Sequence, residues 1–348
     1  MSARLALPAL VVSALLVACG GSAQHRRHPA TAAQPSTVAT RRPTPPPAAV
    51  ATTRPAPPAP EALVTAETEN RLLVVALPSG RIIRRIALPA DPEDIAASRG
   101  RVVVASPAAG KVTVLAATTL RPVRTLGGFR APHIVSMADG LAYVTDDARG
   151  TLTAIDLANL RVTSTIGVGT GAHHMCFDVK HKNAWVALGE TARTLVLVST
   201  KDRAHPRVIG RFPAPFRVHD LACAPESPRV WLTSATGSDV SLVNGFDYRV
   251  VFRVPVGPPP QHVALHGGYA YLTSGYGATI EKVSATNGHI VARASSPYGS
   301  FELAAEDRYV VTSSLLRGTL AIYTAGLRLL RVVHLAPATR EVALGPPT

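Results

Sequence analysis

A unit of about 40 residues recurs through most of this 348-residue chain, and self-similarity at that period is typical of repeat architectures. Each copy contains a short run of β-branched or aromatic residues, which in the clearest copies ends in Thr. These copies are Ala62–Thr65, Ala142–Thr145, Val230–Thr233, Ala270–Thr273 and Tyr309–Thr312. A polar turn and an alternating strand such as Thr151–Ile155 follow, and a further strand such as Arg161–Ile166 closes the unit.

A fourth strand of small apolar residues opens each unit and fixes the number of repeats. Its seven copies are centred on Ile95, Ile134, Met175, Leu221, Val263, Leu303 and Val342, at intervals of 39, 41, 46, 42, 40 and 39 residues. Four strands at this spacing are typical of a β-propeller blade. The first unit lacks its opening strand, and the last opening strand, at Arg340–Leu344, has no strands after it.

The sequence therefore predicts an all-β fold for residues 61–348. The predicted fold is a seven-bladed β-propeller of four-stranded antiparallel blades, closed by the C-terminal strand joining the N-terminal blade. Closure of this kind leaves no terminal strand edge exposed, and so removes a site of aggregation.

The N-terminal 60 residues differ from the rest of the chain. An apolar run from Leu5 to Val17 is too short to span a bilayer, and residues 1–18 are expected to be a signal peptide. The run ends in Leu16-Val17-Ala18-Cys19, which resembles the lipobox of bacterial lipoproteins and implies lipidation of Cys19. The alternative is an ordinary cleaved signal with a chance cysteine.

A linker follows the expected signal peptide. Residues 20–60 contain ten Pro and no aromatic residue, so residues 19–60 are predicted to be a disordered Pro/Ala/Thr-rich linker. The chain is therefore expected to be extracytoplasmic and anchored to the cell membrane as a lipoprotein.

The repeat also resembles a known family. The run Ala142–Gly169 is similar to the YVTN-type (YncE-like) β-propeller repeat, and the resemblance covers roughly residues 61–348. It implies the propeller architecture. Proteins of this group and its neighbours include periplasmic and surface proteins, nucleic-acid or ligand binders and, more distantly, streptogramin lyases and lactonases that use a metal on the propeller face.

One column of the opening strands holds only acidic residues and histidines. It lies directly before the apolar core of each copy and contains Asp94, His133, His174, Asp220, His262, Glu302 and Glu341. The preceding column adds His173 and His219. Because the innermost strands of a propeller line its central channel, these side chains are predicted to form a ring at the channel mouth. Turns between second and third strands should share that face and contribute Asp146, Asp147, Arg149, Glu190, Arg193, Tyr276 and Arg317.

Carboxylates and imidazoles that converge in a low-dielectric channel mouth can recruit a cation. Neutral imidazole and carboxylate groups are ligands for Zn²⁺ and other divalent ions, so a divalent metal is the candidate cofactor. His133, His174 and His262 are the candidate metal ligands and also the candidate catalytic residues.

Three interpretations of the ring remain open. It binds a cation or a polar ligand in a binding or scaffold module, it serves a metal-dependent lyase or lactonase, or it caps loop backbones in a purely structural envelope protein. The sequence contains no GxSxG, P-loop, HExxH or CxxCH motif, which favours a binding module over an enzyme.

The cysteines and the net charge of the chain limit which binding partners are expected. With Cys19 lipidated, Cys176 and Cys223 remain, on neighbouring opening strands. A disulfide is permitted outside the cytoplasm, but small buried residues fill these columns in every repeat, and two free thiols are expected. The chain carries a net charge of +14 without an aromatic–basic stripe, so nucleic acid is not expected as a partner. The expected partners are the membrane, through Cys19, and an envelope protein or a small polar ligand, with the chain a monomer.

Overall fold

The computed structural model describes residues 60–345 apart from residues 99, 226 and 307. These residues form 27 β-strands and no helix, which confirms the all-β prediction. Accordingly, no helix in the described part of the chain has the length and hydrophobicity needed to cross a membrane. The predicted signal peptide (residues 1–18), Cys19 and the predicted linker up to residue 59 lie outside the described residues.

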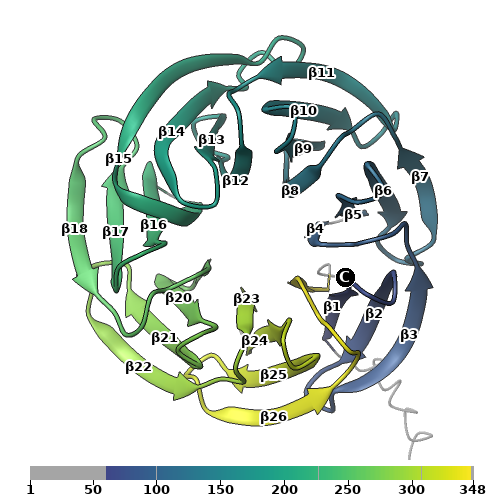
Figure 1. Ribbon diagram of the computed structural model, residues 1–348, viewed down its shortest axis with the longest axis vertical. Helices are drawn as coiled ribbons and strands as arrows, with labels where there is room; N and C mark the ends of the chain where they lie inside the picture. Colours follow the sequence, from purple (N-terminus) through teal and green to yellow (C-terminus); the bar gives the residue numbers. More distant parts are fainter. Residues whose placement is uncertain (1–59, 99, 226, 307, 346–348) are drawn as a thin grey trace, which may run out of the picture. The chain divides into compact units, whose positions relative to one another are not determined.

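The strands form antiparallel sheets, five with four strands and one with seven, and each four-stranded sheet runs from the central axis outward (Figure 1). From the innermost strand outward, three of them are β27 (Val342–Leu344), β1 (Glu61–Ala66), β2 (Arg71–Ala76), β3 (Arg81–Ala87); β4 (Asp94–Ser98), β5 (Arg101–Ser106), β6 (Lys111–Ala116), β7 (Pro122–Leu126); and β8 (Pro132–Ala138), β9 (Leu141–Asp146), β10 (Thr151–Asp156), β11 (Arg161–Gly167). The other two are β19 (Val263–His266), β20 (Tyr269–Ser274), β21 (Thr279–Ser284), β22 (Ile290–Ser295); and β23 (Ser300–Ala305), β24 (Tyr309–Ser314), β25 (Thr319–Thr324), β26 (Leu329–His334). The seven-stranded sheet contains β12 (Ala172–Asp178), β13 (Asn183–Leu188), β14 (Ala192–Ser199), β15 (Arg207–Cys223), β16 (Arg229–Ser234), β17 (Asp239–Asn244) and β18 (Val250–Pro255).

Two strands, β15 and β27, link parts of the fold in an unusual way. β15 is 17 residues long, and it pairs with β14 along its first part and with β16 along its last. It is therefore the outermost strand of one four-stranded unit and the innermost strand of the next. At the other junction β27 pairs with β1, with Val342 opposite Val64 and Leu344 opposite Ala62. The two ends of the described chain thus share one sheet.

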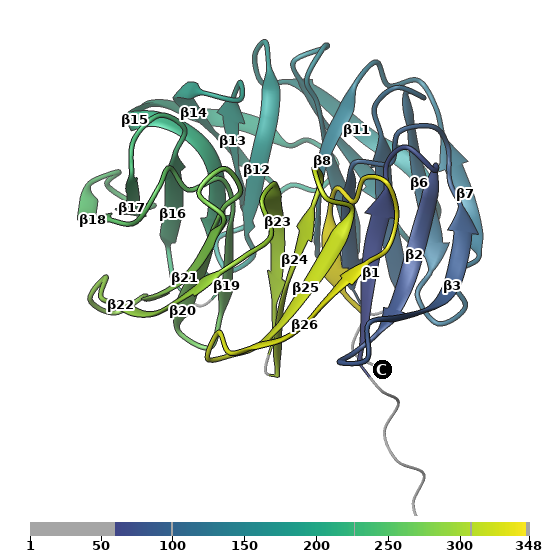
Figure 2. The ribbon, with the colours of Figure 1, turned by 60° about the horizontal axis from the view of Figure 1, so that its bottom comes forward.

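The innermost strands contact one another around the axis. β4 contacts β8, β8 contacts β12, and β12 contacts β15. The series continues from β15 to β19, from β19 to β23, from β23 to β27, and from β27 back to β4. Figure 2 shows the same arrangement tilted, with the strands of each sheet extending between the two faces. Neighbouring innermost strands are not hydrogen-bonded to each other within a sheet, so side chains make most of the contacts between them.

The hydrophobic core lies between neighbouring sheets. The second strand of each sheet is buried on both faces, as in β9, where all six residues are buried. The outermost strands contain mainly exposed and partly buried residues, as in β18. One cluster packs Val64 and Leu73 of the first sheet against Leu320 and Ile322 of the last, so burial itself joins the two ends of the chain.

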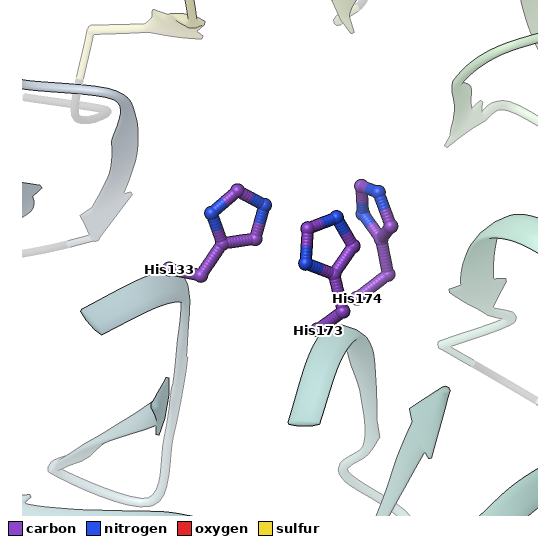
Figure 3. Close-up of side chains that lie close together, drawn as sticks. All are labelled: His133, His173 and His174. Atoms are coloured by element: carbon purple, nitrogen blue, oxygen red, sulfur yellow. The ribbon is translucent and has the colours of Figure 1, made fainter. Parts of the chain in front are cut away.

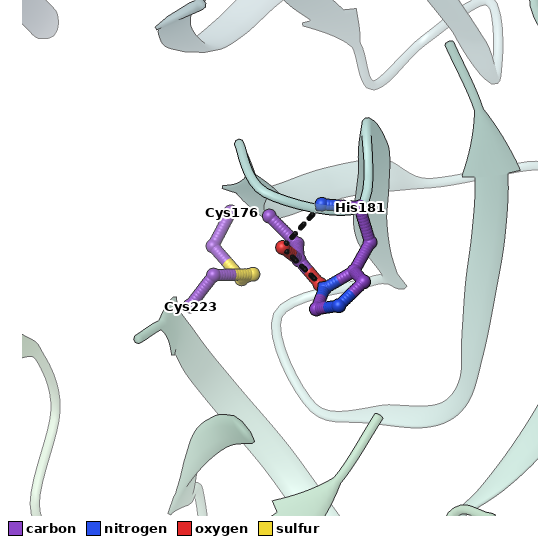
Figure 4. Close-up of a disulfide and its surroundings, with 4 residues drawn as sticks. Cys176, His181 and Cys223 are labelled. Atoms are coloured by element: carbon purple, nitrogen blue, oxygen red, sulfur yellow. Dashed lines mark hydrogen bonds and ion pairs between the residues drawn. A yellow bond between two sulfur atoms is a disulfide. The ribbon is translucent and has the colours of Figure 1, made fainter. Parts of the chain in front are cut away.

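The prediction of two free thiols is wrong. Cys176 of β12 and Cys223 at the end of β15 form a disulfide with a Cα–Cα distance of 5.4 Å (Figure 4). β12 and β15 are neighbouring innermost strands that contact each other around the axis. That contact brings the two cysteines into the range in which a disulfide forms.

Candidate functional site

A cavity lies at the axis, among the ends of the innermost strands. Eight of the nine predicted site residues line it: Asp94, His133, His173, His174, His219, His262, Glu302 and Glu341. Asp220 lies behind the lining and contacts His174 and His262. Glu93, Ile134, Glu190 and Arg340 complete the wall. The cavity volume of about 30 Å³ has room for an ion or a few water molecules.

β-Bulges present the site residues to this cavity. In β12, His173 and His174 together lie opposite one residue of β13, because Ala172 pairs with Leu188 and Met175 with Val186. The same shift occurs in β8 at His133 and in β15 at His219. A bulge interrupts the strict alternation of side chains along a strand, so two successive residues can both reach the axis.

The Thr that ends the repeated run lies opposite the bulge and holds it. Thr145 Oγ1 accepts a hydrogen bond from Ile134 N at 3.0 Å and donates one to His173 O, on the next unit, at 2.8 Å. Thr233 repeats this pattern with Asp220 N at 2.9 Å and Gln261 O at 2.8 Å. The recurring Thr therefore fixes the backbone of site residues on two neighbouring units, a role that the sequence analysis missed although the repetition itself marks it.

Three imidazoles project from β8 and β12 into the central space (Figure 3). His133 and His173 stack with ring centroids 4.0 Å apart, and His174 lies edge-on to His173 at 4.6 Å. One nitrogen from each of the three rings lies within 4.8 Å of the others. A second set with the same spacing contains His174, His219 and His262.

Acidic groups or a backbone carbonyl engage Nδ1 of four histidines. His133 Nδ1 lies 3.3 Å from Glu93, His173 Nδ1 3.0 Å from Asp147, and His174 Nδ1 3.4 Å from Asp220. His219 Nδ1 lies 3.1 Å from the Glu190 carbonyl oxygen. No hydrogen bond or ion pair reaches Nε2 of these rings from the described residues. A metal-binding histidine is usually oriented by a hydrogen-bond partner on one ring nitrogen, with the other nitrogen left for the metal.

Burial keeps part of this group neutral. Burial, and then the nearby His133, lowers the pKa of His173 to about 4, although Asp147 acts in the opposite direction. Burial and the imidazoles of His219 and His262 hold the pKa of His174 well below its usual value. Burial also lowers the pKa of His219. Neutral rings offer the lone pair that a metal ion needs.

His262 differs from the others. Its Nδ1 lies 3.4 Å from Asp220 and its Nε2 2.8 Å from Glu302. Burial alone would lower its pKa, but the carboxylates of Glu302 and Asp220 outweigh burial and raise that pKa to about 10. Burial would raise the pKa of Glu302, and the charge of His262 instead lowers it to about 2. His262 is thus a buried imidazolium between two carboxylates, and both of its ring nitrogens are engaged by them.

The remaining acids of the ring accept hydrogen bonds from backbone N–H groups or have a raised pKa. Asp94 accepts a hydrogen bond from Val135 N on the next unit, and Asp220 accepts one from Val263 N at 3.0 Å. Burial is the main cause that raises the pKa of Asp94 to about 7. Burial and the charge of Glu302 raise the pKa of Glu341 well above its usual value, and the two carboxyl groups share a hydrogen bond. These residues fit the structural capping interpretation, whereas the histidines of β8 and β12 do not.

The turn residues proposed from sequence divide into two groups. Asp147 is the Nδ1 partner of His173, and Glu190 lines the cavity. Asp146, Arg149, Arg193, Tyr276 and Arg317 do not line it. Glu93 and Asp147 were not among the predicted ligands, because nothing in the repeat column shows which acid will contact which histidine.

Comparisons with known proteins give the class of fold. No protein-family model matches this chain, and no curated protein matches its sequence. A protein of unknown function from Desulfotomaculum acetoxidans is similar in structure, with a TM-score of 0.73 at 14% identity over 83% of this chain and 99% of that chain.

Two further solved structures are similar. Apo AztD from Citrobacter koseri has a TM-score of 0.66 at 11% identity, covering 82% of this chain and 98% of that one. Dihydro-heme d1 dehydrogenase NirN in complex with DHE has a TM-score of 0.61 at 14% identity, covering 82% and 66%. Likeness at these identities defines the fold alone. The protein is β-propeller-like, with a histidine-rich cavity at its axis.

Proposed function

We propose that this protein binds a divalent transition-metal ion such as Zn²⁺ at the axis of its sheets, with His133, His173 and His174 as ligands. The observation that carries the proposal is the set of three nitrogen ligands within 4.8 Å of one another. Each of the three rings has Nδ1 beside a carboxylate, and at least His173 and His174 are neutral at pH 7. His173 replaces His262 in the set predicted from sequence.

The architecture that we propose for this binding protein is a closed, seven-bladed propeller of the YVTN (YncE-like) type. Three observations support it: β15 serves two four-stranded units, β27 pairs with β1, and the innermost strands contact one another through to β4. The Thr residues that recur opposite the bulges support the YVTN resemblance.

We further propose that the protein is extracytoplasmic, monomeric and anchored to the membrane through lipidated Cys19. The lipobox-like run before Cys19 supports the anchor, and the Cys176–Cys223 disulfide supports an oxidising compartment. Replacement of Cys19 by Ser should release the protein from the membrane fraction. Retention of this variant in that fraction would overturn the anchor.

The cavity size separates metal binding from the alternative of a lyase or lactonase. A volume of about 30 Å³ accommodates an ion with its remaining water ligands, which favours metal binding as the use of this space. The candidate catalytic residues His133, His174 and His262 are therefore proposed to bind the cation or, in the case of His262, to hold the ring together.

The test is metal binding by purified protein that has been stripped with a chelator. We expect one equivalent of Zn²⁺ by elemental analysis, and a metal-dependent rise in melting temperature because the ion binds only the folded state. His133→Ala and His174→Ala should each weaken binding at least 100-fold, with His289→Ala, at an exposed turn, as the matched control. Absence of bound metal and of a thermal shift across common divalent ions would overturn the proposal.

A further inference from the structure

We infer that the Cys176–Cys223 disulfide is a positioning element for the metal site, because it fixes the strand that carries His174 relative to the strand that carries its orienting carboxylate. The inference rests on the proposed function. It assigns to the two cysteines a role in metal affinity beyond their contribution to stability.

At two junctions between neighbouring innermost strands, a carboxylate of the ring accepts a hydrogen bond from the backbone of the next unit. Asp94 of β4 bonds the backbone N–H of Val135 in β8, and Asp220 of β15 bonds that of Val263 in β19 at 3.0 Å. In both cases an acid in the ring column holds the backbone of the next unit in place.

The step from β12 to β15 lacks this arrangement. The ring column of β12 is occupied by His174, whose imidazole replaces the acid. The covalent link between the two strands is the disulfide, two residues after His174 on β12 and three residues after Asp220 on β15. The disulfide (Figure 4) is thus a covalent link at a junction where the ring column of β12 supplies no carboxylate to the backbone of β15.

His174 depends on this junction more than the other two ligands. Its Nδ1 partner, Asp220, comes from β15, 3.4 Å away. The ring of His219, also on β15, packs against it at 4.9 Å. Glu93 and Asp147, which contact His133 and His173, lie outside this junction. Separation of β12 from β15 would thus release the orientation of His174 and leave the other two ligands in place.

The experiment uses Co²⁺ as a spectroscopic probe of the full chain. Four samples are compared: the oxidised protein, the protein reduced with a phosphine, the Cys176→Ala/Cys223→Ala variant, and Val310→Ala as a control. Val310 is fully buried in β24, so its truncation lowers stability without contact with the histidines. The double variant also excludes new thiolate ligands as the cause of a spectral change.

We expect reduction and the double substitution each to weaken Co²⁺ binding about tenfold, the range found for loss of an outer partner of a metal ligand. The visible absorption of bound Co²⁺ should change, reoxidation should restore affinity and spectrum, and Val310→Ala should keep both despite a lower melting temperature. In metal-free protein, reduction should shift the ring-proton NMR resonances of His174 and His219 and leave that of His289 unchanged.

The outcomes separate the two proposals. Failure of the oxidised protein to bind Co²⁺ would overturn the metal site and the inference with it. If the oxidised protein binds but the reduced protein and the double variant bind within twofold of it with the same spectrum, only the inference is overturned. Reduction of folded protein supplies the result if the double variant does not fold.

Discussion

His174 and His262 occupy the same column of the repeat, and their environments drive their pKa values in opposite directions. His174 is surrounded by other imidazoles and has one carboxylate partner, so burial dominates and its pKa falls. His262 lies between two carboxylates, which outweigh burial and raise its pKa to about 10. At the scale of the residue, the partners rather than the residue type decide which histidine is neutral and which one is charged.

The imidazolium of His262 makes stability depend on pH. Its folded-state pKa of about 10 lies above the unfolded value of 6.5, so its contribution is complete below pH 6.5 and is lost as pH rises towards 10. His262→Gln should therefore lower the free energy of unfolding by about 3–5 kcal/mol at pH 7, because it leaves two buried carboxylates without their cation.

Denaturant unfolding at pH 6, 8 and 10 measures this effect. The difference between the wild-type protein and His262→Gln should narrow as pH rises, with His289→Gln as the exposed control. A difference that stays constant from pH 6 to pH 10 would contradict the assignment of His262 as an imidazolium.

At the scale of the element, the bulge and its Thr form a recurring device. The bulge turns two successive residues towards the axis, and the Thr hydroxyl on the adjacent strand satisfies the N–H that the bulge leaves without a ladder partner. The same hydroxyl donates to the next unit and so joins sheets that share no ladder at that point. One polar side chain thus supports both the fold and the placement of His173.

Thr145→Val tests this device. Valine keeps the shape of the side chain but leaves Ile134 N and His173 O, both beside the axis, without their partner. We expect the free energy of unfolding to fall by about 1–3 kcal/mol, the cost of unsatisfied buried polar groups. Thr163→Val is the comparison variant, since Thr163 is an exposed residue of β11 whose hydroxyl donates one hydrogen bond, to Ala154 O at 3.2 Å, away from the axis. Equal losses in the two variants, measured by urea unfolding, would reject the proposed role of Thr145.

The sequence repeat was sufficient to predict antiparallel four-stranded sheets and the meeting of distant ring residues. The units have the same order of strands, so aligned positions of successive units face the same axis. The contacts within the ring could not be predicted. Glu93 and Asp147 come from different positions of their units, and the pairing of Cys176 with Cys223 depends on the spacing of two strands that share no ladder there.

At the scale of the whole molecule, the last strand of the described chain completes the first sheet. Val342 and Leu344 of β27 are buried beside β1, and Thr65 N donates a hydrogen bond to Glu341 O at 3.0 Å. The innermost strand of the first unit is therefore supplied by the other end of the sequence. The ring of titratable residues also depends on it, because Glu341 belongs to this segment.

Truncation after Arg340 removes this strand. We expect a loss of about 3–6 kcal/mol, since two buried aliphatic side chains contribute about 1.5–3 kcal/mol each. The uncovered edge of β1 should also promote self-association. A truncation that removes only residues 346–348 leaves β27 intact and is the control. Thermal unfolding and light scattering measure both effects, and a melting temperature equal to that of the full chain would argue against this role of β27.

Because of β15, the free energy of local unfolding should differ between parts of the molecule. Elsewhere the chain leaves one ladder through a loop before it enters the next, so each unit can fluctuate without its neighbour. β15 pairs with β14 as far as Pro213 and again at Val218, where its pairing with β16 begins, so melting of either unit would remove hydrogen-bond partners from a strand that the other unit needs. Residues 172–255 should therefore exchange their amide hydrogens as one cooperative block, and more slowly than the rest of the chain.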